Sequence, residues 1–478
     1  MERGFAQTNP SLKKNKELNP FLLVIFSFML VILVGTIFLL MPFSQTTPHF
    51  DTWSNFWNNL VDCFFLSVSA TCVTGLCTFS NGIANQLTLA GQIAVLVMIQ
   101  IGGLGFITVL SFLLTIFNRK ISFKNRNFLS QAVGSTSFGN VVSFVRKIIL
   151  VSFSVELIGT GLLIPVFMQT EDANISNIIW RSIFHSVSAF NNAGFDILGN
   201  TSLLRESGTI VASLPGWAYV YMNVVIMTLI ILGGISFLVI FDVFSGKRPH
   251  SWRAFTKVAL TMAAILLVGG TLLFVGFECF KSTNPMNVME AIFQSVTCRT
   301  AGFAIYDQEN LSVGGRIVSC VLMFIGASPL GTAGGVKTTT LFMVVISLAS
   351  FITGRDVHAF KRTYSNQSII KAMVLLAVAV TVVIICYCGI AGIESGRAIY
   401  EDKDASSILL FECFSAFGTV GLSQNWTPNL LWGSKLIITL LMFVGRLGPM
   451  TLFQVLQTNL NKKSTKSFSY VEEDFLIG

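Results

Sequence analysis

The chain has 478 residues, of which 53% are hydrophobic and 11% are charged, and its formal net charge is +8. This composition excludes a soluble multidomain enzyme and predicts an all-α protein that crosses a membrane several times. The cationic residues recur in alternate polar segments instead of forming a nucleic-acid patch, so we expect no nucleic-acid partner. The nine cysteines lie mostly in apolar stretches without metal-ligand spacing, which is typical of small buried residues.

In chain order, eight apolar segments are long enough to cross a bilayer, which takes about 20 residues. They lie at 21–41, 88–117, 147–168, 217–244, 258–280, 316–351 (interrupted), 369–392 and 435–457. Between the two members of each successive pair lies a shorter apolar segment, at 54–70, 177–189, 286–297 and 405–416. These four segments are too short to span, so we interpret them as pore helices that dip into the membrane and return as extended backbone.

Each pore helix leads into a polar stretch that closes on a glycine, namely Gly75, Gly194, Gly302 or Gly421. Subtracting these positions gives intervals of 119, 108 and 119 residues. The near-constant period predicts four copies of one span–pore-helix–span unit. Because each unit crosses the membrane twice, all four enter from the same side, and we expect parallel repeats in pseudo-four-fold order around one pore.

The distribution of Lys and Arg residues predicts the orientation of the chain in the membrane. Of the 31 cationic residues, 21 fall in five polar segments, at 3–16, 119–147, 247–257, 355–371 and 462–466. These segments lie on one side of the membrane if every second span crosses, and the positive-inside rule makes that side cytoplasmic. We therefore expect a multi-pass protein of the cell membrane with both termini in the cytoplasm.

The expected organisation follows from these spans. It comprises a cytoplasmic N-terminus (1–20), repeat 1 (21–117), a cytoplasmic loop (118–146), repeat 2 (147–245), a second loop (246–257), repeat 3 (258–352, with an intramembrane loop at 326–340), a third loop (353–368), repeat 4 (369–458) and a cytoplasmic tail (459–478).

The polar glycine stretches carry the candidate chemistry. A dehydrated monovalent cation needs several oxygen dipoles at once to replace its hydration shell, and glycine permits the backbone angles that turn carbonyl groups inward. We predict that K⁺ binds at the carbonyl groups of a selectivity filter made of Val73, Thr74, Gly75, Asn192, Ala193, Gly194, Thr300, Ala301, Gly302, Thr419, Val420 and Gly421. The alternative is a re-entrant loop that only plugs the helix bundle.

Charged residues near the filter need partners, because an ionised group at membrane depth is costly. We expect Arg299 to point away from the pore axis and to bond carbonyl groups or an acidic partner. We expect Asp62, Arg181, Glu290 and Glu412 to pair with one another around the pore helices.

The sixth span is broken by small residues, a proline and a cation. A phosphate-binding loop is a poor interpretation, since the stretch lacks the required Gly-Lys adjacency and lies between apolar halves. We predict a gate below the filter formed by Gly326, Ser328, Pro329, Gly331, Gly334, Gly335 and Lys337, with Arg446 of the last span as its counterpart. The alternative is a helix that is kinked for packing.

In these features the chain resembles members of the superfamily of K⁺ transporters that includes the Trk, Ktr and plant HKT proteins. The resemblance rests on the four units, on one glycine per filter, on Thr300-Ala301-Gly302-Phe303, on the broken span and on Arg446, and it runs from about residue 20 to the C-terminus. Because no extra pair of spans precedes the first unit, the chain is most similar to the membrane subunit of bacterial Ktr systems. The acidic ending Glu472-Glu473-Asp474 also resembles that subfamily.

The resemblance implies K⁺ uptake, often Na⁺-dependent, by a homodimer in membrane lipid, in which each chain has its own pore. It further implies a cytoplasmic ring of nucleotide-binding regulatory subunits (RCK-type, KtrA-like) that controls the gate loop. K⁺ is then the transported ion, and no tightly bound cofactor is expected. Cys72 and Cys298 stand where a small polar residue is expected, and they would alter selectivity if they faced the ion path.

Two other functions compete with a pore. A coupled Na⁺/K⁺ carrier with alternating access needs paired acids near the membrane midplane, and Glu156 is the one strong candidate. A membrane enzyme needs a nucleophile, a metal site or a carboxylate pair, none of which the sequence offers. We therefore expect no enzymatic activity.

Overall fold

The computed structural model of this chain describes residues 20–46, 53–80, 82–105, 141–170, 174–199, 203, 210–246, 248–397 and 404–448. The expected N-terminal segment 1–20, the loop 118–146 and the tail 459–478 lie wholly or mostly outside these residues. The ends of the expected second and eighth spans, beyond 105 and 448, lie outside them as well.

The described residues are mostly helical. The main helices are α1 (Pro20–Leu40), α2 (Trp53–Cys72), α3 (Gly82–Gln86), α4 (Leu89–Leu104), α7 (Val141–Phe167), α8 (Ile175–Phe190), α9 (Gly216–Gly234), α10 (Phe237–Val243), α11 (Ala254–Glu278), α12 (Val288–Thr297), α13 (Val313–Phe324), α14 (Thr338–Thr353), α15 (Asn366–Glu394), α16 (Ala405–Gly418) and α17 (Trp432–Leu447). Single 3₁₀ turns lie at Pro42–Ser44, Ile210–Ser213, Pro249–Ser251, Gln308–Asn310 and Thr427–Asn429.

Local sequence signals set several helix ends. The Thr88 and Ser312 side chains cap α4 and α13 by accepting backbone N–H groups of Gly91 and Gly315. α14 ends at Gly354, which adopts the left-handed conformation that glycine tolerates.

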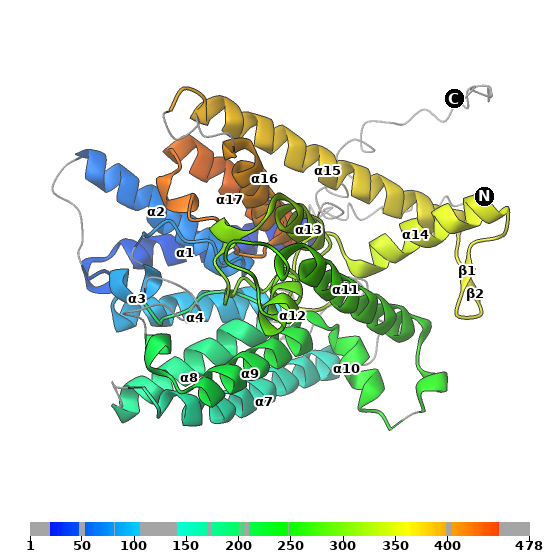
Figure 1. Ribbon diagram of the computed structural model, residues 1–478, viewed down its shortest axis with the longest axis horizontal. Helices are drawn as coiled ribbons and strands as arrows, with labels where there is room; N and C mark the ends of the chain where they lie inside the picture. The colour runs from blue at the N-terminus through cyan, green and yellow to red at the C-terminus, as the bar shows by residue number, and fades with distance from the viewer. Residues whose placement is uncertain are drawn as a thin grey trace, which may run out of the picture.

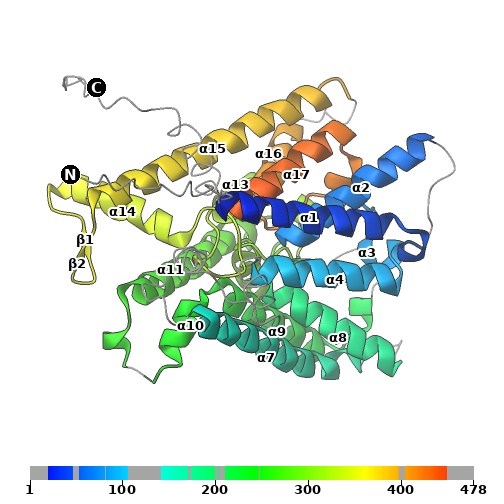
Figure 2. The ribbon, with the colours of Figure 1, turned by 180° about the vertical axis from the view of Figure 1, so that it is seen from behind.

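The helices form four groups around the middle of the molecule. We call them the first unit (α1, α2, α4), the second (α7, α8, α9), the third (α11, α12, α13) and the fourth (α15, α16, α17). The second unit lies at the bottom and the fourth at the top of Figure 1, whereas the third faces the viewer there and the first faces the viewer in Figure 2. Contacts of α4 with α8, α9 with α12, α13 with α16 and α17 with α2 close the ring.

Four of the described helices are long and apolar enough to cross a membrane, namely Ser143–Phe167, Gly216–Gly234, Ala254–Glu278 and Asn366–Glu394. Ile25–Leu40, Leu89–Leu104, Val313–Phe324, Thr338–Thr353 and Ala405–Gly418 are apolar but shorter. Large apolar side chains are exposed on the outer faces of the long helices, for example Leu157 of α7 and Ile385 of α15. Such a surface is suited to lipid and not to water.

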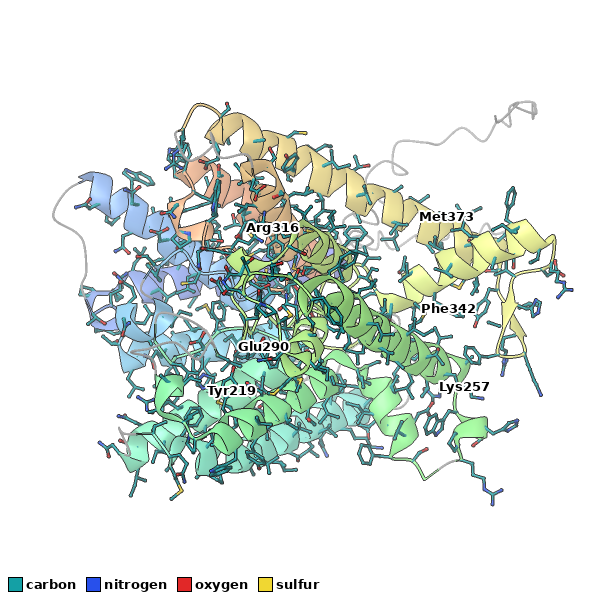
Figure 3. The ribbon with its side chains drawn as sticks, viewed as in Figure 1. Tyr219, Lys257, Glu290, Arg316, Phe342 and Met373 are labelled. Carbon is teal, nitrogen blue, oxygen red and sulfur yellow. The ribbon has the colours of Figure 1, made fainter. Side chains whose placement is uncertain are left out.

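One element departs from a purely helical fold. Strands β1 (His358–Ala359) and β2 (Arg362–Thr363) form a small antiparallel hairpin within the segment expected to be a cytoplasmic loop. It lies beside α14 in Figure 1, and Phe342 of α14, labelled in Figure 3, stacks on Phe360 at the hairpin turn. Phe360 and Lys361 both adopt positive φ there, and no glycine or proline marks this turn in the sequence.

Glycines let the helices of one unit approach closely. A Cβ atom on Gly233 of α9 would collide with the carbonyl group of Phe190, at the end of α8. Gly102 and Gly445 meet the ends of α2 and α16 in the same way, through Thr71 and Phe417. The small residues of these helices therefore hold each short helix against the helix that follows it.

We predict that Gly233→Ala lowers the free energy of unfolding by roughly 1–3 kcal/mol, because the added methyl group overpacks the contact with Phe190. Gly276→Ala is the matched control, since Gly276 lies inside α11 and a Cβ atom there meets nothing within 4 Å. Thermal unfolding of the purified protein in detergent measures both. Equal melting temperatures for the two variants would contradict the packing role of Gly233.

Candidate functional site

The four polar glycine stretches adopt the same backbone conformation. Val73, Asn192, Thr300 and Thr419 have positive φ angles of 58°, 58°, 71° and 50°, and each stands two residues before its glycine. A non-glycine residue rarely adopts this left-handed conformation, and such strain persists only where the surrounding structure imposes it. All four units impose it at the same place.

The four glycines meet one another in a closed ring. A Cβ atom on any of them would collide with a carbonyl oxygen of the next unit. The oxygens are those of Ala193 for Gly75 (2.5 Å), Ala301 for Gly194 (2.7 Å), Val420 for Gly302 and Thr74 for Gly421. Glycine is therefore required at all four positions, both for its positive φ and for this contact.

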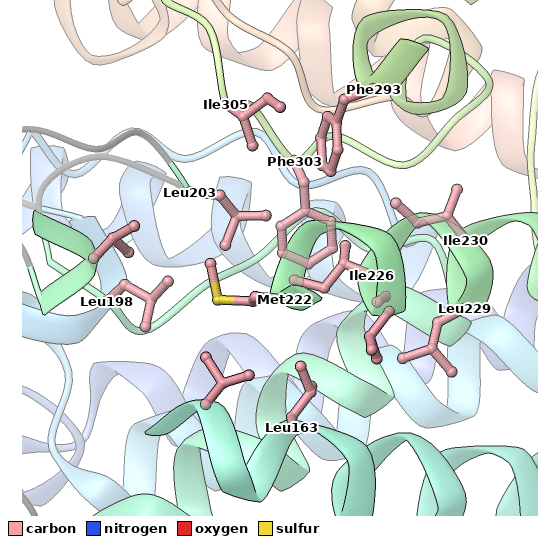
Figure 4. Close-up of a cluster of buried hydrophobic side chains, with 14 of the residues drawn as sticks. Leu163, Leu198, Leu203, Met222, Ile226, Leu229, Ile230, Phe293, Phe303 and Ile305 are labelled. Atoms are coloured by element: carbon pink, nitrogen blue, oxygen red, sulfur yellow. The ribbon is translucent and has the colours of Figure 1, made fainter. Parts of the chain in front are cut away.

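The residue after each glycine anchors the ring from outside. Leu76, Phe195, Phe303 and Leu422 are all at most 2% exposed. Each is buried in a cluster that contains side chains of the preceding unit. Figure 4 shows this for Phe303 of the third unit, which packs with Met222 and Ile226 of α9. The chain thus locks every unit to its neighbour immediately beside the ring.

Hydroxyl groups hold the backbone that leads into the ring, and the sequence reading missed them. Ser69 and Ser415 accept the N–H groups of Gly75 and Gly421 at 3.2 and 3.1 Å. Ser188 and Thr297 donate at 2.6 Å to the carbonyl groups of Phe195 and Phe303. The signal was present, because a serine stands six residues before the glycine in the first, second and fourth units.

Other hydroxyl groups of these stretches have no protein partner. The Oγ1 atoms of Thr74, Thr300 and Thr419 are buried and accept or donate no hydrogen bond among the described residues. A buried polar atom of this kind is normally satisfied by water or a ligand. Oxygen donors besides the carbonyl groups are therefore available at the ring.

The irregular loop between α13 and α14 lies next to the ring. α13 ends at Phe324 and α14 begins at Thr338, and a bridge between Ile325 and Val336 closes the loop between them. The loop crosses to the second unit, where the N–H groups of Ser328 and Thr332 donate to Gly234 and Gly233, both at 3.2 Å.

The glycines of this loop fit against close backbone neighbours. Gly326 faces the carbonyl group of Gly334, Gly331 faces that of Gly234, and Gly334 faces the Thr419 side chain of the fourth unit. Gly335 has a φ of 66°. Pro329 lies in a turn in which the Gly331 N–H donates to Ser328. The loop is thus fixed by hydrogen bonds and close packing on two sides.

Arg446 joins this loop to two further units. From α17 its guanidinium donates to the carbonyl groups of Thr332 in the loop and Gly102 at the end of α4. Lys337 does not reach across, since its Nζ atom donates to Ala333 at 2.5 Å within the loop itself. One side chain therefore connects the fourth unit, the loop and the first unit.

Asp62, Glu290 and Glu412 were expected to pair with other charged residues around the four short helices. The structure gives them different partners. Asp62 forms an ion pair with Lys435 of α17 at 2.7 Å. Glu290 accepts the Asn287 N–H and caps its own helix α12. Glu412 accepts hydrogen bonds from Ser423, Gln424 and Thr427. Hydroxyl and amide donors already satisfy the carboxylates of Glu290 and Glu412, so these two residues need no cationic partner.

Glu156 and Arg299 complete the buried charges near the ring. Glu156 of α7 is 4% exposed and accepts hydrogen bonds from the side-chain amides of Gln100 and Asn191. Arg299 donates to the carbonyl group of Ala263 on α11 at 3.1 Å. This hydrogen bond agrees with the expectation that Arg299 bonds a carbonyl group.

The chain matches the family described as TrkH, cation transport protein, over residues 19–468. It is 34% identical to the potassium/sodium uptake protein NtpJ of Enterococcus hirae, over 97% of this chain and 98% of that protein. It is 35% identical to the Ktr system potassium uptake protein B of Bacillus subtilis, over 89% of this chain and 90% of that protein.

A solved structure shares the fold. The crystal structure of the potassium transporter TrkH from Vibrio parahaemolyticus superimposes with a TM-score of 0.68 and covers 94% of this chain and 86% of that one. The two sequences are 16% identical, so this likeness concerns the fold alone.

We predict that Ser415→Ala lowers the free energy of unfolding by roughly 1–3 kcal/mol, because it leaves the partly buried Gly421 N–H without its acceptor. Ser182→Ala is the control, since the Ser182 hydroxyl only donates to Ile178 within α8 and its loss orphans no N–H group. Thermal unfolding in detergent measures the difference. A Ser415 variant no less stable than the control would show that this hydroxyl does not support the ring.

Proposed function

The chain belongs to the TrkH family of cation transport proteins, and on this premise we propose that it takes up K⁺ through a channel-like pore in the cell membrane. The family consists of cation transporters and not of enzymes. The relatives described as potassium uptake proteins span nearly the whole chain, which supports K⁺ as the transported ion.

The observation that carries the proposal is the ring of four glycines. Each unit brings a backbone carbonyl group to the same place, from Thr74, Ala193, Ala301 and Val420. A cluster of carbonyl dipoles replaces the hydration shell of a cation and offers no hydrogen-bond donor to an anion. We assign this ring, with the residues on either side of the four carbonyl groups, as the selectivity filter.

We further propose that the loop 325–337 is the gate. It lies against the ring through Gly334 and Thr419, and it is tied down by Arg446. Irregular backbone at membrane depth is tolerated only where protein or water satisfies it, so a loop without the continuous hydrogen bonding of a helix is a suitable moving part. Displacing it requires the bond between Arg446 and Thr332 to break.

Partners follow from the same premise. Three of the relatives carry the name of the Ktr system, and we propose that this chain is likewise the membrane subunit of such a system. A homodimer and a cytoplasmic nucleotide-binding ring of the RCK type that acts on the gate loop belong to this proposal, as does the cytoplasmic location of both termini.

A coupled Na⁺/K⁺ carrier is the alternative, and Glu156 is the residue that would support it. Its hydrogen-bond partners Gln100 and Asn191 are neutral amides, and among the described residues no second carboxylate shares the site. A single acid with neutral partners does not form the acid pair that ion coupling would use, so the pore is the better-supported function.

We predict that Gly421→Ser reduces the K⁺ over Na⁺ preference roughly tenfold, which equals a loss of about 1.4 kcal/mol, because the side chain displaces the Thr74 carbonyl group. Gly354→Ser is the control, since Gly354 also has a positive φ but a Cβ atom there meets nothing within 4 Å. Ion uptake into cells that lack their own K⁺ uptake measures the ratio. A ratio unchanged in the Gly421 variant would count against the filter.

We also predict that shortening the segment 327–337 raises K⁺ flux several-fold without changing the K⁺/Na⁺ ratio, since the gate is weakened and the filter is left intact. Deleting Phe360 and Lys361 from the hairpin turn is the control, and it should leave flux unchanged. Flux into liposomes from purified protein provides the measurement. If the flux of a folded, shortened variant stays at the wild-type level or falls, the loop is not the gate.

A further inference from the structure

The third unit differs from the second at one position beside the ring. Asn191 and Arg299 both stand three residues before their glycine. In the second unit, the Asn191 amide donates at 3.0 Å to the carboxylate of Glu156 on α7. Glu156 precedes Gly194 by 38 residues, and Ala263 precedes Gly302 by 39. Ala263 of α11 is therefore at nearly the position in the third unit that corresponds to Glu156 in the second. The third unit therefore has a stronger donor and no acid.

The Arg299 guanidinium is only partly satisfied. It is 9% exposed, and its Nη1 atom donates to the Ala263 carbonyl group at 3.1 Å. Its Nε atom is buried and donates to no acceptor among the described residues. A buried cation with an unused donor is costly unless something else neutralises it.

A cavity of about 30 Å³ lies beside this guanidinium. Arg299 and Ser328 of the gate loop are the polar side chains of its lining, and the remaining residues, which include Ala263, are apolar or glycine. One water needs roughly 10–15 Å³ of such space, so the cavity has room for one or two waters or a single small ion.

The acids on the surrounding elements lie far from Arg299 and have other partners. Glu290 lies in the first turn of α12, nine residues before Arg299, and caps that helix. Glu278 is fifteen residues beyond Ala263 and binds Lys281 and Ser312. Asp242 of α10 binds Thr256, seven residues before Ala263. No acid on these elements neutralises the guanidinium directly.

We propose that this cavity is a binding site for a single halide ion, which takes the place that the Glu156 carboxylate holds in the second unit. Arg299 supplies the charge and the free Nε–H donor, and the Ser328 hydroxyl supplies a second donor from the gate loop. The apolar remainder of the lining favours a monovalent anion that is only weakly hydrated, and the volume of the cavity limits the site to a single halide. The bound anion joins the filter stretch of the third unit to the gate loop.

The experiment compares melting temperatures of the purified full-length protein in detergent at constant K⁺, with potassium chloride or bromide exchanged for potassium gluconate. Gluconate is too large for the cavity. For wild-type protein we expect the halides to raise the melting temperature by about 2 °C. A melting temperature that does not depend on the anion would overturn the proposal.

Two variants assign the effect to this cavity. Arg299→Gln removes the positive charge that attracts the halide. Ala263→Asp supplies a carboxylate that neutralises Arg299 in place of the halide, so both variants should lose the halide response. Arg397→Gln is the matched control and should retain it, because Arg397 already pairs with Glu394 at 2.8 Å. A halide response that persists in Arg299→Gln would place the anion elsewhere.

Bromide also gives a direct readout that does not depend on the folding of any variant. Crystals of the wild-type protein grown in potassium bromide should show an anomalous scattering peak within hydrogen-bonding distance of the Arg299 guanidinium. Ordered water there, with no anomalous peak, would overturn the proposal.

Discussion

The structure depends on one constraint, namely that four backbone segments meet at a single place with no side chain between them. Each unit places a glycine against a carbonyl group of the next unit, namely Gly75, Gly194, Gly302 or Gly421. In every unit the residue two positions before this glycine is held in a left-handed conformation. Such backbone cannot satisfy itself, because it is neither helix nor sheet. The short helices, their serine hydroxyls and the buried Leu or Phe after each glycine supply the missing contacts.

The interlocking of neighbouring units follows from the same constraint. Each residue after a glycine is buried in a cluster shared with the preceding unit, so no unit can complete its core alone. The packing glycines of α4, α9 and α17 then press each short helix onto the helix that follows it. A ring built in this way is rigid, and the loop between α13 and α14 is the irregular segment that lies beside it.

The four units are related but not equal. Arg446 of the fourth unit reaches both the loop of the third and the end of α4 in the first, and no counterpart of this bond is found among the other described units. The second unit buries a carboxylate beside its polar glycine stretch, whereas the third buries a guanidinium beside a cavity. These differences lie next to the ring and not in it, so the ring keeps its common backbone while each side has its own support.

The sequence by itself determined the helical membrane character, the family, and the positions of the four glycines, because composition, period and residue type are local properties of the chain. It also marked the broken span, since proline and several glycines interrupt an apolar run. It did not determine the partners of the charged residues: Asp62 binds Lys435, which is 373 positions away in the chain, and no spacing rule reports such a distance. The cavity beside Arg299 likewise depends on which surfaces meet. Only the tertiary structure decides that, because each contact joins segments whose separation in the sequence carries no information about their separation in space.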